Sequence, residues 1–147
     1  MEFEGNYNNG LKNEIIKEFY DYDAKLIFEG DYINNEKNGF GKEYNDKGEL
    51  IFEGEYVKGM KNGKGKEYYK NKLIFEGEYL KDKRWNGKGK EYDKHFKSNI
   101  IYEGEYLNGE WSGKGKKYYF NSLIYEGEFL HGKYNGREKE YHYDKLE

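Results

Sequence analysis

The fold is decided by a stretch that reads Leu73-Ile74-Phe75-Glu76-Gly77-Glu78-Tyr79-Leu80. Through its middle, this stretch alternates with the period of two that is typical of a β-strand and not of a helix. Phe75, Gly77 and Tyr79 then share one face, while Glu76 and Glu78 share the other. The stretch therefore predicts a strand with an aromatic face and a charged face.

The same pattern recurs along the chain. An aromatic residue, an acid, a glycine, any residue and a second aromatic residue follow one another six times, at intervals of 23 to 27 residues. A glycine-rich element comes ten or eleven residues after the start of most copies, as in Asn62-Gly63-Lys64-Gly65, and the first and last copies depart from it. Such atypical ends are expected of an open repeat array. The copies begin at Phe3, Phe28, Phe52, Phe75, Tyr102 and Tyr125.

Pairing between neighbouring strands follows from the same alternation. An antiparallel pair of residues 63–66 and 73–80 sets lysines beside glutamates, and glycines beside aromatic rings. Because glycine weakens a strand by roughly 0.5–1 kcal/mol relative to alanine, its fixed positions predict rings that lie across the backbone there. Strict alternation puts Glu67 on the glycine face and Tyr68 with the lysines, which leaves open whether a bulge intervenes.

Short connectors separate the predicted strands. They run over about five residues within a repeat, as in residues 57–61, and over a similar stretch between repeats, as in residues 70–72. Both lengths suit hairpin turns. The fourth repeat is longer than its neighbours, with one additional residue before Asn86 and three within residues 93–99. We expect these two turns to bulge.

Composition restricts the function classes. Only 35% of the 147 residues are apolar, so the 18 Tyr, 9 Phe and 2 Trp must supply most of the buried area. The net charge of −3 comes from interleaved acids and bases without a basic block, so no nucleic acid is expected as a partner. The absence of cysteine excludes disulfides, and the amino terminus has no signal-peptide pattern. These features predict a cytoplasmic protein.

The repeat resembles the MORN repeat (membrane occupation and recognition nexus). Residues 102–115, Tyr102-Glu103-Gly104-Glu105-Tyr106-Leu107-Asn108-Gly109-Glu110-Trp111-Ser112-Gly113-Lys114-Gly115, match it most closely, and the resemblance covers nearly the whole chain. It implies an all-β fold, a single-layer, elongated antiparallel meander of about six β-hairpins. The single array would span residues 1–147, with repeats at about 3–27, 28–51, 52–74, 75–101, 102–124 and 125–147.

Catalytic and metal chemistry are not indicated. Paired carboxylates such as Glu76 and Glu78 occur in most copies, whereas an active site is normally unique. Gly-Lys-Gly-Lys lacks the helix and the Ser/Thr step of a phosphate loop. His95, His131 and His142 lack the spacing of metal ligands. We therefore expect no enzyme activity, no metal, no cofactor and no small-molecule substrate.

Candidate binding residues lie where the copies differ. The residue before each Asn-Gly or Ser-Gly pair is expected near a hairpin tip, where it either anchors a partner or packs on the neighbouring tip. Packing is favoured for Trp111 and exposure for Trp85. The partner-binding candidates are Met60, Trp85, Trp111, Tyr134, His95 and Phe96, and the scaffold aromatics that line the aromatic and glycine groove are Phe52, Tyr56, Phe75, Tyr79, Tyr102 and Tyr106.

Three functions remain open at this point. The leading hypothesis is a non-enzymatic interaction or scaffold module that binds another protein or a second copy of itself, as the resemblance to MORN arrays also implies. The second is a small inhibitor, antitoxin or immunity-type protein that blocks a protein partner. The third is binding to a phospholipid surface. The lipid hypothesis is not favoured, because each lysine row has a glutamate row beside it.

Overall fold

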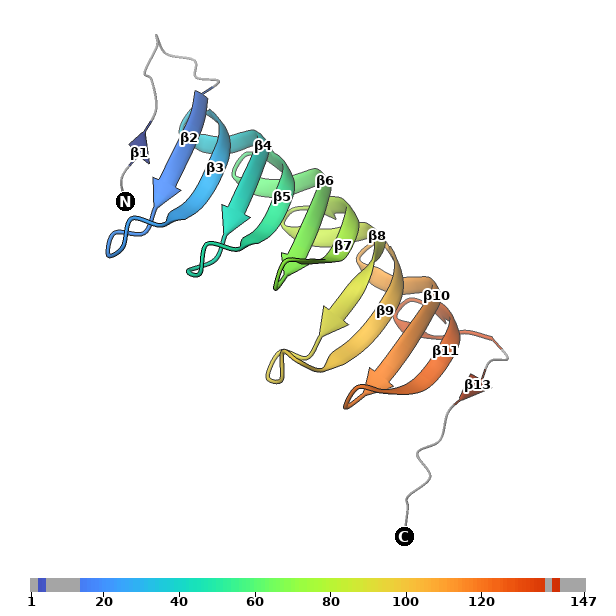
Figure 1. Cartoon of the computed structure of the whole chain (residues 1–147). Coiled ribbons are helices and arrows are strands. Elements are labelled where there is room, and N and C mark those ends of the chain that lie inside the picture. Colours follow the sequence, from blue (N-terminus) through green and yellow to red (C-terminus); the bar gives the residue numbers. More distant parts are fainter. Residues whose placement is uncertain (1–2, 5–13, 137–138, 141–147) are drawn as a thin grey trace. The chain divides into compact units, whose positions relative to one another are not determined.

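The computed structural model describes residues 3–4, 14–136 and 139–140 and consists of antiparallel strands and turns. By residue contacts the chain divides into two compact units, an N-terminal unit (Met1–Lys83) and a C-terminal unit (Arg84–Glu147), which are described separately below. The predicted all-β class and the succession of antiparallel hairpins are confirmed (Figure 1). No helix that is long and apolar enough to cross a membrane is present among the described residues.

The strands pair in chain order within each unit. The N-terminal unit contains β1 (Phe3–Glu4), β2 (Glu14–Phe19), β3 (Leu26–Ile33), β4 (Glu36–Tyr44), β5 (Leu50–Val57), β6 (Met60–Tyr69) and β7 (Lys72–Leu80). The next strand, β8 (Lys83–Tyr92), begins at the last residue of that unit. In the C-terminal unit β8 is followed by β9 (Ile100–Leu107), β10 (Glu110–Tyr119), β11 (Ser122–Leu130), β12 (Lys133–Tyr134) and β13 (Lys139–Glu140), and both β12 and β13 pair with β11.

The turns at the hairpin tips are tighter than the predicted five-residue connectors. Between β5 and β6 only Lys58 and Gly59 lie outside the strands. Both have positive φ, 49° and 81°, which is the conformation of the turns whose twist matches that of the flanking strands. The prediction was too long because the strands continue through Val57 and Met60, which pair with each other.

The observed register confirms the predicted lysine and glutamate pairing. In β6 and β7, Lys64 lies opposite Glu78 and Lys66 opposite Glu76. The predicted pairing of glycines with aromatic residues holds for Gly63, which lies opposite Tyr79, whereas Gly65 lies opposite another glycine, Gly77. The register shifts after Glu67, so a bulge is present at the point that the sequence left open.

The core is one layer of aromatic rings on a single face of the strands, here called the aromatic face. Phe52, Tyr56 and Tyr79 are between 1% and 4% exposed, although no second sheet covers them among the described residues. Each ring is covered by the next in edge-to-face contact: Tyr56 lies 5.6 Å from Phe52, and Phe52 lies 5.1 Å from Tyr79. In the C-terminal unit Tyr102 and Phe129 make the same contact at 5.2 Å.

Glycine lets these rings lie on the backbone. A Cβ atom added to Gly65 would come within 2.8 Å of the Phe52 ring and 2.9 Å of the Tyr79 ring. Such distances are shorter than van der Waals contact, so the rings occupy the space that a side chain would need. The opposite face carries the glutamate and lysine rows and is called the charged face.

Candidate interaction surfaces

In most repeats, the residue before the Asn-Gly or Ser-Gly pair turns onto the aromatic face. Lys61 places its Nζ 4.1 Å from the centre of the Phe52 ring, and Lys37 places its own 4.0 Å from Phe28. Trp111 stacks on Tyr102 at 4.4 Å with an interplanar angle of 3°. Tyr134 stacks on Tyr125 at 4.2 Å in the same way and keeps 46% of its surface exposed. These side chains therefore cover the core rings, while their predicted role in partner binding stays a prediction.

In the fourth repeat, Arg84 covers the core ring, and the next residue, Trp85, makes the backbone bond to the following tip. The Arg84 guanidinium lies 5.6 Å from the Tyr106 ring, as Lys37 does from Tyr56, and its Nη1 donates to the Tyr106 hydroxyl at 3.2 Å. Trp85 keeps the backbone bond of this position, because its carbonyl accepts from the Gly109 N–H at 2.9 Å as the Lys37 carbonyl accepts from the Gly59 N–H at 2.8 Å. The Trp85 ring lies near Gly109 at the next tip and is half-buried, whereas the sequence favoured exposure. The additional residue before Asn86 shifts the sequence at this point by one. Sequence reasoning therefore missed Arg84, although the insertion was visible.

Carboxylates on the aromatic face accept hydrogen bonds from the tyrosine hydroxyls of the core. Tyr56 donates its hydroxyl hydrogen to Glu43 at 2.6 Å, and Lys61 forms an ion pair with the same carboxylate at 3.3 Å. Burial raises the pKa of Tyr56 far above its ordinary value, and the hydrogen bond to Glu43 adds to the shift. Tyr79 donates likewise to Glu67. Glu67 therefore stays on the aromatic face, as strict alternation predicted.

A similar network is present in the C-terminal unit, with a tryptophan in place of the lysine. Glu91 accepts hydrogen bonds from the Tyr106 hydroxyl at 3.2 Å and from the Trp111 Nε1 at 2.9 Å. Burial raises the pKa of Tyr106 and the nearby Arg84 lowers it, with a net increase. Trp111 is thus held by stacking and by a hydrogen bond, in accordance with the preference for packing that the sequence indicated.

The paired carboxylates Glu53 and Glu55 have separate structural roles. Glu55 accepts a hydrogen bond from the Lys64 backbone N–H at 2.6 Å, at a bulge where Gly63 has a φ of 103°. Glu53, two residues earlier, accepts from the Tyr68 hydroxyl at 2.8 Å on the charged face. Both carboxylates are therefore engaged in holding the strands.

The two histidines that the structure describes, His95 and His131, are exposed. No group of three or more His, Cys, Asp or Glu side chains that could hold a metal ion is present in the described part of the chain. His131 places its Nδ1 2.9 Å from Glu110 on the surface. His142, another histidine that the sequence analysis considered, lies outside the described residues.

These features of the hairpin agree with a comparison of the sequence with protein families. The family model of the MORN repeat matches residues 28–49, 52–73, 102–123 and 125–137, which together are more than half of the chain. The chain belongs to the MORN repeat family. MORN repeats are non-enzymatic modules that commonly mediate protein or membrane interactions. No curated protein matches this MORN chain significantly.

An exposed group of aromatic side chains lies at the turns between repeats in the C-terminal unit. Phe96, Tyr119 and Phe120 are 60%, 59% and 61% exposed. Tyr119 and Phe120 contact each other edge to face at 4.6 Å. We call these three residues the edge cluster. Phe96 was predicted as a candidate; the other two were missed, although Phe120 stands where the turn between β6 and β7 has Lys70.

Hydrogen bonds fix the turns that carry the edge cluster. Asp93 accepts from the backbone N–H groups of His95 and Phe96 at 2.7 and 2.8 Å, and these bonds lower the pKa of its carboxyl group. Asn121 accepts from the Ile100 N–H at 2.8 Å and donates to Asn99 at 3.1 Å. The two bonds of Asn121 therefore join the turn of residues 93–99 to the turn between β10 and β11. Within the first of these turns, residues 94–98 are exposed.

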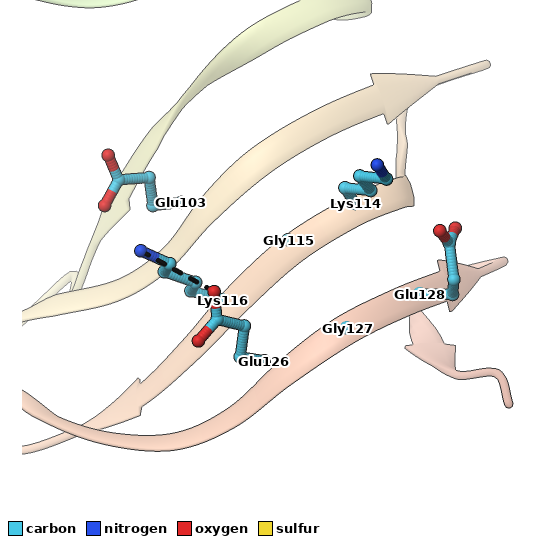
Figure 2. Close-up of a pocket in the computed structure, with 7 residues that line it drawn as sticks. All are labelled: Glu103, Lys114, Gly115, Lys116, Glu126, Gly127 and Glu128. Atoms are coloured by element: carbon cyan, nitrogen blue, oxygen red, sulfur yellow. Dashed lines mark ion pairs between the residues drawn. The ribbon is translucent and has the colours of Figure 1, made fainter. Parts of the chain in front are cut away.

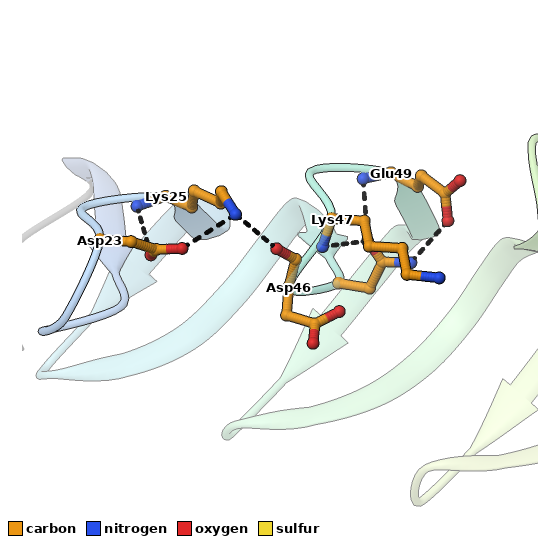
Figure 3. Close-up of polar contacts among 6 residues, drawn as sticks. Asp23, Lys25, Asp46, Lys47 and Glu49 are labelled. Carbon is orange, nitrogen blue, oxygen red and sulfur yellow. Dashed lines mark hydrogen bonds and ion pairs between the residues drawn. The ribbon is translucent and has the colours of Figure 1, made fainter.

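The corresponding turns of the N-terminal unit are held by polar contacts (Figure 3). Lys25 forms an ion pair with Asp23 at 2.9 Å and donates from its Nζ to the Asp46 carbonyl oxygen at 3.1 Å. Asn45 accepts from the Glu49 backbone N–H at 2.9 Å. Both units therefore join successive turns, each by its own side chains.

Shallow grooves lie on the charged face. In the C-terminal unit, Gly115 and Gly127 lie between Lys116 with Glu126 on one side and Lys114 with Glu128 on the other, around a groove of about 320 Å³ (Figure 2). In the described part of the N-terminal unit, Phe40 lines two further grooves of this kind, of about 500 and 280 Å³. Phe40 is 50% exposed. The predicted candidate Met60 is 37% exposed at a hairpin tip.

Proposed function

We propose that this MORN repeat protein is a non-catalytic module that binds another protein through the edge cluster. The exposure of Phe96, Tyr119 and Phe120, each near 60%, is the observation that carries the proposal. Exposed aromatic side chains that are fixed in place are frequent anchors of protein interfaces, because they bury a large area at little cost in side-chain entropy.

The position of the cluster in the repeat supports this role. Side chains that recur in every repeat, such as Tyr56 and Tyr106, are buried in the core and form its hydrogen bonds. Phe96 belongs to the turn that only the fourth repeat has enlarged, and Phe120 departs from the polar residue of the corresponding turn. Phe96 and Phe120 thus lie where the requirements of the scaffold do not dictate aromatic residues.

The charge beside the cluster indicates what kind of partner it fits. Lys94 and Lys97 are exposed on either side of Phe96, while the nearby carboxylate of Asp93 is engaged by backbone N–H groups. Complementary charge across an interface speeds association and selects partners. An acidic protein surface with apolar side chains fits this arrangement.

The experiment is affinity purification of the tagged full chain from its native host after mild cross-linking. The double variant Phe96→Ala and Phe120→Ala is expected to lose a partner that the wild-type chain recovers. Tyr22→Ala, which removes another highly exposed ring in the N-terminal unit, serves as the matched control. An unchanged partner set in the double variant contradicts the proposal.

A third variant tests the other predicted site. Trp85→Ala and Met60→Ala together remove candidate residues at the hairpin tips. Loss of the partner in this variant, with retention in the edge-cluster variant, moves the binding site to the tips. Circular dichroism of all variants checks that the fold is retained.

A further inference from the structure

The grooves of the N-terminal unit follow a line of glycines across the sheet. Gly30, Gly41, Gly54, Gly65 and Gly77 lie directly opposite one another in five successive strands, β3 to β7. On the charged face this line is the floor, and the side chains before and after each glycine form two walls. The two grooves of about 280 and 500 Å³ lie along it.

The first wall alternates in charge from strand to strand. Lys17 lies opposite Glu29, Glu29 opposite Lys42, and Lys42 opposite Glu53. The ion pair of Lys17 and Glu29 is 3.9 Å long, and its side chains are 43% and 37% exposed. An exposed ion pair of this length contributes little to stability, so Lys17 and Glu29 are available to a second partner, whereas Glu53 already accepts a hydrogen bond from Tyr68.

The second wall is apolar where other repeats are charged. Ile15 is 65% exposed and Phe40 is 50% exposed, and both line the groove of about 280 Å³. Between them lies Asp31, whose carboxylate accepts a hydrogen bond from the Phe40 N–H at 3.0 Å. In the position of Phe40, later repeats carry Lys64, Lys88 and Lys114. The groove thus has one charged wall and a second wall in which two exposed apolar side chains flank Asp31.

Strand spacing determines what can lie in this groove. Neighbouring strands are about 4.8 Å apart, and an α-helix rises about 1.5 Å per residue. One strand therefore corresponds to roughly three residues of a helix that lies along the glycine line. Side chains of alternating charge at every third or fourth position of such a helix would lie beside successive charges of the first wall. Apolar residues six or seven positions apart would meet Ile15 and Phe40, which are two strands apart.

We infer that the charged face of the N-terminal unit binds a short amphipathic α-helix of a partner protein along the line from Ile15 to Phe40. The helix carries alternating Glu and Lys on one side and leucine-like residues on the other. An extended chain fits less well, because its side chains on one face recur every 6.6 to 6.8 Å, roughly. Since each strand is rotated by about 20–25° against the next, the groove turns along its length, so a straight helix that lies in it must be short. The inference rests on the proposed protein-binding function but uses a separate surface.

A designed peptide tests the inference. The probe is a labelled, end-capped helical peptide of about four turns, with alternating Glu and Lys on one side and leucines seven positions apart on the other. A second peptide has the same composition, with all Glu in one half and all Lys in the other. Fluorescence anisotropy with the full chain is expected to show that the patterned peptide binds at least tenfold more tightly.

Phe40→Lys is the decisive variant. It installs the residue that other repeats carry at this position, so the hairpin is retained. Its affinity for the patterned peptide is expected to fall about tenfold. Phe120→Ala, in the other unit, is expected to bind the peptide as the wild-type chain does.

Four results overturn the inference. They are equal binding of the two peptides, unchanged binding by Phe40→Lys, tighter binding of an extended peptide with the same charges, and a change of oligomeric state in Phe40→Lys that shows a second copy in the groove. The edge-cluster experiment is independent of these titrations. A partner that survives loss of Phe96 and Phe120 counts against the proposed function and leaves the peptide result unaffected.

Discussion

Tyr56 donates its hydroxyl hydrogen to Glu43 over 2.6 Å, from one repeat to the carboxylate of the repeat before it. Lys61 lies 3.3 Å from the same carboxylate and 4.1 Å from the Phe52 ring. A single glutamate thus satisfies a buried hydroxyl and a lysine that covers the core. This arrangement makes the position of Glu43 more sensitive to substitution than those of the exposed glutamates.

Replacing Glu43 by leucine is expected to lower the free energy of unfolding by about 1–3 kcal/mol, because the Tyr56 hydroxyl and the Lys61 ammonium lose their acceptor. Urea denaturation measures the change. Glu43→Gln is the matched control, since its amide oxygen can still accept from Tyr56, and its effect should be smaller. Equal stability of the two variants would show that the hydrogen bond does not matter.

Gly65→Ala is expected to destabilise the fold by about 1–3 kcal/mol, the range of overpacked cores, because the new Cβ would lie within 2.8 Å of the Phe52 ring. Gly59→Asn is the control. It has positive φ but no atoms within 4 Å of an added Cβ, and asparagine tolerates this conformation. Thermal melts compare the two, and similar melting temperatures would contradict the proposed contact of ring and backbone.

Alkaline pH should unfold the protein through its buried tyrosines. Burial raises the pKa values of Tyr56, Tyr102 and Tyr106 above the ordinary value of about 10. Above that pH the unfolded chain loses phenolic protons that the folded chain retains, so stability is complete below pH 10, roughly, and falls as the pH rises further. Phenolate absorbance should show exposed tyrosines titrating first and buried ones only together with the loss of circular dichroism. Titration of all tyrosines in one step near their ordinary pKa, with the fold intact, would disprove the expectation.

Trp111→Ala should lower stability by about 2–3 kcal/mol, less than for a fully buried ring, because the indole is only partly covered by Tyr102 and bonded to Glu91. Trp111→Lys should cost less, since lysine holds the same position over Phe52 at Lys61. Urea denaturation followed by circular dichroism provides both values. A lysine variant that is less stable than the alanine variant would refute the equivalence of the two positions.

Replacing Asp93 by alanine is expected to loosen the turn of residues 93–99, because the His95 and Phe96 amides lose their acceptor. Hydrogen exchange of these two amides should become faster, with little change in the melting temperature. Since the folded pKa of Asp93 is depressed, the wild-type chain should lose the same protection as the pH falls through that lowered pKa. Unchanged exchange in the variant would remove the role assigned to this carboxylate.

The period of the sequence was sufficient for the strands, their order and the pairing of lysines with glutamates, because side-chain alternation and repeat length constrain these directly. The period was not sufficient to predict the bulges and side-chain contacts within each repeat. Gly63 adopts positive φ at a bulge closed by Glu55, and such a contact spans neighbouring strands in a register that the repeat length does not reveal. Arg84 was missed because the fourth repeat has one inserted residue. Arg84 therefore covers the Tyr106 ring, while the carbonyl bonded to the next tip belongs to Trp85.

The exposed surfaces were the hardest to predict. Phe96 could be singled out because its turn is longer than the others. Phe120 and Phe40 occupy ordinary positions in repeats of ordinary length, and they are recognised only when each residue is compared with its counterpart in the other repeats. Their exposure depends on which face and which turn they occupy, and that required the three-dimensional register.

The hydrogen bond from Tyr56 to Glu43 has a consequence for how such a chain can change its length. Each joint in the core is built from residues of two successive repeats, with Tyr56 against Phe28 at 5.4 Å and beside Glu43. Removing residues 52–74 as one block would bring Tyr79 into the place of Tyr56 and recreate the same joint. A deletion of half that size would leave a core tyrosine, the counterpart of Tyr56, without the glutamate that accepts its hydroxyl hydrogen bond. We therefore expect the core to tolerate loss or duplication of whole repeats, whereas insertions of other sizes should be confined to the turns, as in residues 93–99.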